Sequence, residues 1–84
     1  MSLALARAAR DAARLAQHEE RFTDAVRGWS IAVGFFDAAV MEAHVPSSTK
    51  TLVRQRDHAA VMLTLTRAVV ELQAQITSLP NGRT

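Results

Sequence analysis

Cysteine is absent from this 84-residue chain, so disulfide bridges and thiolate metal sites are excluded. The three glycines stand singly, and no glycine-rich loop is present to hold a phosphate group. No apolar run approaches the roughly 20 residues that span a bilayer, and no segment alternates apolar and polar residues. We therefore expect no transmembrane segment and no strands. The chain is predicted to form a single all-α domain without a metal or cofactor.

The chain also has little excess of positive over negative charge. The net charge is +2, and the calculated pI of 10.5 reflects a small excess of arginine over acidic residues. Proteins that depend on phosphate contacts usually carry a denser basic patch. The first residues contain no apolar stretch of the kind found in secretory signals. We expect a cytoplasmic protein that reaches membranes only through its partners.

The segment from residue 22 to residue 40 contains all three phenylalanines and the only tryptophan. Its large apolar residues recur at alternating steps of four and three, which places them on one helix face. These core candidates are Phe22, Val26, Trp29, Val33, Phe36 and Val40. Small residues run beside them, namely Ala25, Gly28, Ala32 and Ala39. This segment is predicted to be the middle helix, with the small residues admitting a neighbouring helix closely.

Three helices are predicted, each beginning at a Ser or Thr that can cap its first turn. They run from Ser2 to about Glu20, from Thr23 to about Ala43, and from Ser48 or Thr49 to about Ser78. The inner face of the first helix is expected to comprise Leu5, Ala9, Ala12 and Ala16. Residues 1–79 are predicted to form an antiparallel, up-down-up three-helix bundle, and residues 80–84 a flexible tail.

The third helix has two apolar faces. The expected core face comprises Val61, Leu65, Ala68, Leu72, Ile76 and Leu79. Nearly opposite lie Leu52, Ala59, Leu63, Val70 and Ala74, with Arg56 and Arg67 alongside. A helix with two apolar faces has more to bury than a three-helix bundle usually covers. We interpret the second face as a groove or dimer face that accepts an amphipathic helix; the alternative is scattered surface residues or a deeper core.

No arrangement of residues indicates catalysis. His18, His44 and His58 are far apart in the sequence, and none has a metal-ligand spacing. The hydroxyl residues that could serve as nucleophiles, at positions 47–49, resemble helix caps. We expect a protein that is not an enzyme.

Seven positions match the spacing A-x3-D-x4-Y-x2-A-x3-Y-x2-A-x3-F/L from the end of the first helix through the second. They are Ala13, Gln17, Phe22, Ala25, Trp29, Ala32 and Phe36. An arginine–alanine pair, at positions 67 and 68, stands in the third helix. This pattern resembles that of MIT (microtubule-interacting and trafficking) domains, which are three-helix modules of about this length. The alanine and aromatic positions are also similar to those of tetratricopeptide-like helical pairs.

The resemblance implies a non-catalytic adaptor that binds a helical segment of a membrane-trafficking or autophagy protein. Gln17 stands where the family has an acid, and Phe22 and Trp29 stand where it has tyrosines. MIT domains that hold the basic tails of ESCRT-III proteins have an acidic third helix, whereas Arg56 and Arg67 accompany the second apolar face here. The segment at residues 52–58 is more similar to the N-terminal MIT domain of the autophagy adaptor in the class III phosphatidylinositol 3-kinase complex.

Three hypotheses follow for the partner. The first is a protein helix from a trafficking or phosphatidylinositol 3-kinase complex, with Leu52, Leu63 and Val70 as apolar anchors and Arg56 and Arg67 contacting its acidic residues. The second is nucleic acid within a ribonucleoprotein complex. Its phosphates would be contacted by Arg7, Arg10, Arg14, Arg54 and Arg56. The third is a homodimer in which the second apolar face of the third helix and a weaker one on the second helix, at Ile31 and Phe35, cover each other.

Overall fold

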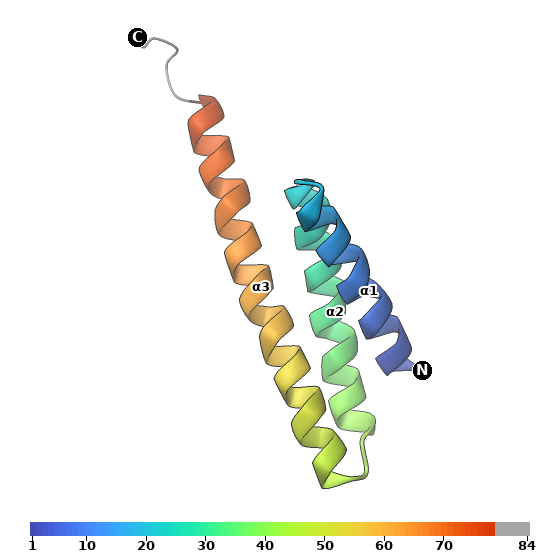
Figure 1. Ribbon diagram of the computed structural model, residues 1–84. Coiled ribbons are helices and arrows are strands. Elements are labelled where there is room, and N and C mark those ends of the chain that lie inside the picture. The colour runs from blue at the N-terminus through green and yellow to red at the C-terminus, as the bar shows by residue number, and fades with distance from the viewer. Residues whose placement is uncertain (79–84) are drawn as a thin grey trace.

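The computed structural model describes residues 1–78 and contains three helices within them (Figure 1). Helix α1 spans Ser2–His18, α2 spans Phe22–Glu42 and α3 spans Pro46–Ser78. No strand occurs within these residues, so the predicted all-α, three-helix fold is confirmed. In Figure 1, α2 runs opposite to α1 and α3, which is consistent with the predicted up-down-up order. The predicted tail at residues 80–84, and Leu79, lie outside the described residues.

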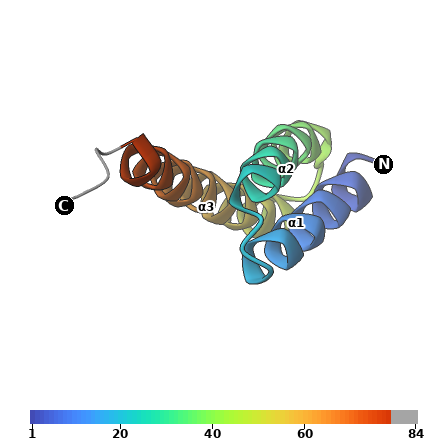
Figure 2. The same ribbon diagram turned by 90° about the horizontal axis from the view of Figure 1, so that it is seen from above.

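Helix α2 is the centre of the fold. It packs against both α1 and α3, whereas direct contact between α1 and α3 is slight. Seen from above, α3 leads away from the other two helices towards its C-terminal end (Figure 2). The fold is therefore two helical hairpins that share α2, with a space left between α1 and α3.

Alanine forms the contact between α1 and α2. The buried residues of the two helices are Ala6, Ala13, Ala16, Ala25, Ala32 and Ala39, together with the aromatic residues of α2. A Cβ atom built on Gly28 would lie 2.9 Å from the Cβ of Ala13, closer than real Cβ atoms approach. Gly28 therefore marks the point of closest approach, as the stripe of small residues predicts. The predicted inner positions of Leu5 and Ala12 are wrong, because the buried face of α1 runs through Ala6, Ala13 and Ala16, which leaves Ala12 exposed and Leu5 49% exposed.

The aromatic residues of α2 fill the centre of the molecule. Trp29 and Phe36 are fully buried, which confirms their predicted place in the core. Phe22, Val26 and Val33 are half-buried at its edge. The core lies along α2, at the meeting point of the two hairpins.

Trp29 also contacts both other helices. Its indole N–H donates a hydrogen bond to Gln17 Oε1 of α1 at 3.1 Å, and its ring meets the His58 ring of α3 edge-on, with centroids 5.9 Å apart. The polar end of the buried indole is therefore paired, as burial requires.

The two apolar faces of α3 are the reverse of the prediction. Leu65 and Leu72, predicted as core residues, are 55% and 56% exposed. Leu52, Ala59 and Thr66 are buried instead. A step of two residues turns about 200° around a helix, so the two stripes lie on nearly opposite sides. The small side chains of Ala59 and Thr66 provide the space that the large aromatic residues of α2 need, and this determines which face turns inward.

The helix starts also differ from the predicted caps. Neither α1 nor α2 has a side-chain hydrogen bond at its N-cap, so the capping roles predicted for Ser2 and Thr23 are wrong. The Ser2 hydroxyl instead donates to Glu42 Oε2 at 2.7 Å, which joins the start of α1 to the end of α2. Helix α3 begins at Pro46, before the predicted Ser48, because proline suits the first turn of a helix, where no N–H is needed.

The turn between α1 and α2 contains an unusual backbone conformation. Glu20 has a φ of 62°, in the left-handed region. The Arg21 N–H donates to the Ala16 carbonyl at 2.7 Å, and the Glu20 N–H donates to the Gln17 carbonyl at 3.0 Å. This pair of hydrogen bonds is the Schellman motif, in which glycine normally occupies the left-handed position. A glutamate there is strained.

Candidate interaction surfaces

One apolar stripe remains uncovered on the outside of α3. It is called the outer seam and consists of Val61, Leu65, Ala68, Leu72 and Ile76. Its four large residues are 55%, 55%, 56% and 68% exposed, and their spacing places them on one face of the helix. The sequence predicts this same stripe as the core face of the third helix, so that prediction is wrong.

The outer seam continues past the end of the α1–α2 hairpin. Helix α3 has 33 residues and α2 has 21, which at about 1.5 Å per residue makes α3 longer by about 18 Å. Figure 1 shows this final part of α3 extending beyond the turn between α1 and α2. Residues 71–78 are all exposed, so none of the residues that the structure describes covers the second half of the seam.

Two of the five predicted partner-binding residues lie inside the fold. Leu52 is 7% exposed, and Leu63 packs against the core. The prediction that they face outwards as anchors is therefore wrong, because this face of α3 covers α2 of the same chain. For the same reason this face is not free to cover a second copy, as the homodimer hypothesis requires.

The two predicted arginines lie in different surroundings. Arg56 donates hydrogen bonds to Asp57 at 3.1 Å and to Asp37 of α2 at 3.3 Å. These carboxylates raise the pKa of the Arg56 guanidinium, the hydrogen bond to Asp57 most of all. Arg67 is exposed and, with Val70, lines a pocket of about 290 Å³ beside the start of α2. Of the predicted set, only these two residues share a surface feature.

A basic cleft lies between α1 and α3. One part, of about 420 Å³, is lined by Arg14, Gln17, His18, Trp29, His58 and Met62. The adjoining part, of about 380 Å³, is lined by Arg10, Arg14, Arg54, Gln55 and His58. The two parts share Arg14 and His58, and no acidic residue lines either. The sequence analysis named Arg10, Arg14 and Arg54 as phosphate contacts, but only the folded chain brings α1 and α3 to one cleft.

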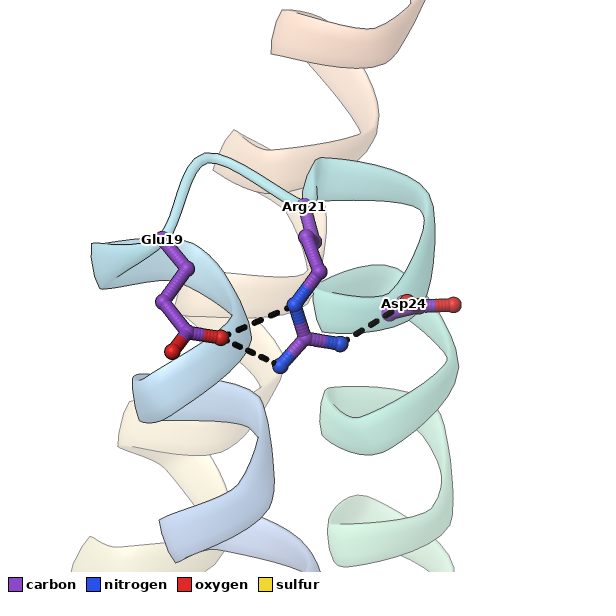
Figure 3. Close-up of polar contacts among 3 residues, drawn as sticks. All are labelled: Glu19, Arg21 and Asp24. Carbon is purple, nitrogen blue, oxygen red and sulfur yellow. Dashed lines mark hydrogen bonds and ion pairs between the residues drawn. The ribbon is translucent and has the colours of Figure 1, made fainter.

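The turn between α1 and α2 is held by a cluster of charged residues (Figure 3). Arg21 Nε and Nη2 donate to Glu19 Oε1 at 2.9 and 2.7 Å, and Arg21 Nη1 donates to Asp24 Oδ2 at 2.9 Å. The hydrogen bonds to Glu19, and then the one to Asp24, raise the pKa of the Arg21 guanidinium. The cluster joins the end of α1 to the first turn of α2, and we assign it a structural role.

The described residues were also compared with what metal binding and membrane crossing require. Among residues 1–78, no three His, Cys, Asp or Glu side chains lie close enough together to hold a metal ion. None of the helices described has the length and apolar character needed to cross a membrane.

Comparison with family models, curated proteins and solved structures finds no match to this chain. The resemblance to MIT domains therefore remains a prediction that rests on the residues quoted for it.

Proposed function

We propose that this protein is a non-catalytic interaction module whose outer seam binds one amphipathic helix of a partner protein. The observation that carries the proposal is the exposure of Val61, Leu65, Leu72 and Ile76 along a single stripe. Contiguous apolar patches on soluble proteins commonly mark interaction sites. A stripe with steps of four and three residues suits a helix, because helical side chains at these intervals interdigitate.

The charges beside the seam define the chemistry of this partner. Lys50 and Arg54, both exposed, continue the line of the seam towards the start of α3, eleven and seven residues before Val61, respectively. A helix laid along the seam would meet apolar side chains over most of its length and two positive charges at one end. The proposed ligand is accordingly an amphipathic helix whose apolar stripe is followed by acidic residues.

The resemblance to MIT domains supports a more specific role. It leads us to propose a cytoplasmic adaptor whose ligand belongs to a membrane-trafficking or autophagy complex, such as the class III phosphatidylinositol 3-kinase complex. The hydrogen bond between Gln17 and Trp29 is relevant, because both residues depart from the family pattern. The amide accepts from the indole, so the two departures form a matched pair within the fold.

The decisive experiment is affinity capture from cell lysate with paired variants of the full chain. Leu65→Asp with Leu72→Asp places two charges on the outer seam. Leu5→Asp with Leu15→Asp makes the same change at leucines of α1 that are 49% and 54% exposed. We expect a trafficking or kinase-complex protein to be captured by the native chain and the α1 variant and lost from the α3 variant. Its binding should persist in high salt, because apolar contacts dominate.

Circular dichroism of the same variants tests whether a loss of capture results from unfolding. Helicity should be equal in both, since all four leucines are exposed. Equal capture by both variants would contradict the proposal. So would a native chain that dimerises in analytical ultracentrifugation and becomes monomeric in the α3 variant, because a second copy would then cover the seam.

A further inference from the structure

We propose that the basic cleft between α1 and α3 is a binding site for a compact, hydroxyl-bearing molecule with adjacent phosphate groups. This inference does not depend on the outer seam, and the cleft shares only Arg54 with the line of residues that extends it. The proposal rests on charge, on shape and on one unpaired polar atom.

The charge in the cleft comes from two helices. Arg10 and Arg14 reach it from α1, and Arg54 reaches it from α3. Within residues 1–78, Arg14 and Arg54 make no ion pair, and Arg10 pairs only with its neighbour Asp11, at 3.1 Å. Guanidinium groups bind phosphate oxygens through two parallel hydrogen bonds. A ligand with several negative charges is needed to offset the repulsion among three such groups.

The shape of the cleft follows from the packing of α2. Alanine brings α1 close to one side of α2, while α3 packs on the aromatic residues, so α1 and α3 remain apart. The space between them has Trp29 in its floor, and its two parts measure about 420 and 380 Å³. Pockets for small molecules commonly have volumes of about 300–1,000 Å³. The cleft therefore suits a compact ligand.

Gln55 supplies the unpaired atom. Its Oε1 is buried and accepts no hydrogen bond in the part of the chain described. Buried polar atoms are almost always paired, so an unpaired one next to a cleft indicates a missing donor. Gln55 lines the cleft, and a rotation of its amide towards the cleft would let a hydroxyl group on the ligand supply this donor. The imidazoles of His18 and His58 line the same space and offer further hydrogen bonds.

Such a ligand has two natural sources, a soluble phosphorylated polyol or the headgroup of a phosphorylated lipid. The first probe is myo-inositol 1,4,5-trisphosphate, which has two adjacent phosphates and three free hydroxyl groups, titrated into the full chain at physiological ionic strength by isothermal titration calorimetry. The second probe is a phosphatidylcholine vesicle with or without a phosphoinositide, assayed by co-sedimentation. Binding of the soluble probe alone assigns a soluble ligand, whereas binding of the phosphoinositide vesicle assigns a headgroup, and either supports the site.

Matched arginine variants distinguish the cleft from general charge. Arg14→Gln and Arg54→Gln remove charges from opposite walls, and we expect each to weaken binding by at least about tenfold. Arg7→Gln and Arg27→Gln remove exposed charges that do not line the cleft, and these should change affinity by less than about twofold. Arg14→Lys keeps the charge without the paired hydrogen-bond donors and should give an intermediate loss.

Three results would overturn the proposal. One is the absence of binding to either probe. Another is equal weakening by all four glutamine variants, which would show that net charge alone drives association. The third is a preference for single-stranded RNA with affinity that rises with its length and is equal in the cleft and control variants.

Discussion

The two interfaces of α2 are formed by different kinds of side chain. Towards α1 it presents small residues, and Gly28 lets the backbones approach until no further carbon atom fits. On the side of α3 it presents Trp29 and Phe36, and Ala59 of α3 belongs to the same buried cluster. The first interface gains stability from close contact over a short length, and the second from the volume of its aromatic side chains. One helix can therefore hold two neighbours at different separations, and the space between those neighbours becomes a cleft.

The largest expected effect comes from breaking the interface between α2 and α3. Leu63→Asp places a carboxylate against the core, and we expect it to lower the free energy of unfolding by at least about 3 kcal/mol. Leu65→Asp changes a residue two positions away that is 55% exposed and should alter stability by about 0.5 kcal/mol or less. Urea denaturation followed by circular dichroism measures both. The opposite ranking would mean that the faces of α3 are those predicted from the sequence.

A smaller effect is expected at the interface between α1 and α2. Gly28→Ala adds a carbon atom only 2.9 Å from the Cβ of Ala13, so a backbone must move. This crowding outweighs the better helix propensity of alanine, and the net loss should be about 1–2 kcal/mol. Gly34→Ala is the matched control, because nothing lies within 4 Å of an added Cβ there. It should stabilise the chain by about 0.5–1 kcal/mol. Two variants with the same sign in thermal denaturation would refute the close approach at Gly28.

The smallest expected effect is in the turn between α1 and α2, which lies outside both interfaces. Glu20→Gly relieves the left-handed backbone of the turn and should stabilise the α1–α2 hairpin by about 0.5–1 kcal/mol. Glu20→Ala keeps the strain and should change little. The side-chain hydrogen bonds of Arg21 go to Glu19 and Asp24, not to Glu20. A stabilising effect of alanine equal to that of glycine would therefore point to charge removal instead of backbone strain.

Much of this architecture can be predicted from spacing alone. The burial of Trp29 and Phe36 and the closeness of α1 follow from the order of large and small residues in α2. The faces of α3 do not follow, because both of its apolar stripes have helical spacing and the bulkier stripe is the one that a sequence pattern favours as core. Which stripe turns inward depends on the volume that α2 already fills, and this is a property of the packed pair.

The two candidate sites also differ in how far the sequence predicts them. The outer seam can be recognised in the sequence as an apolar stripe, but its exposure is known only from the structure. The basic cleft combines Arg14 with Arg54, residues 40 positions apart on helices that barely touch. No local pattern links them, so their shared space emerges only when α2 fixes both helices in three dimensions.

The single tryptophan gives this protein a built-in optical probe. Trp29 is the only indole in the chain, and it touches α1 through Gln17 and α3 through His58 at the floor of the cleft. Its fluorescence therefore has one origin. Separation of either hairpin admits water to the indole and shifts its emission to longer wavelengths, and occupancy of the cleft changes the surroundings of the same ring. Unfolding and ligand binding can thus be followed in the native chain without a label.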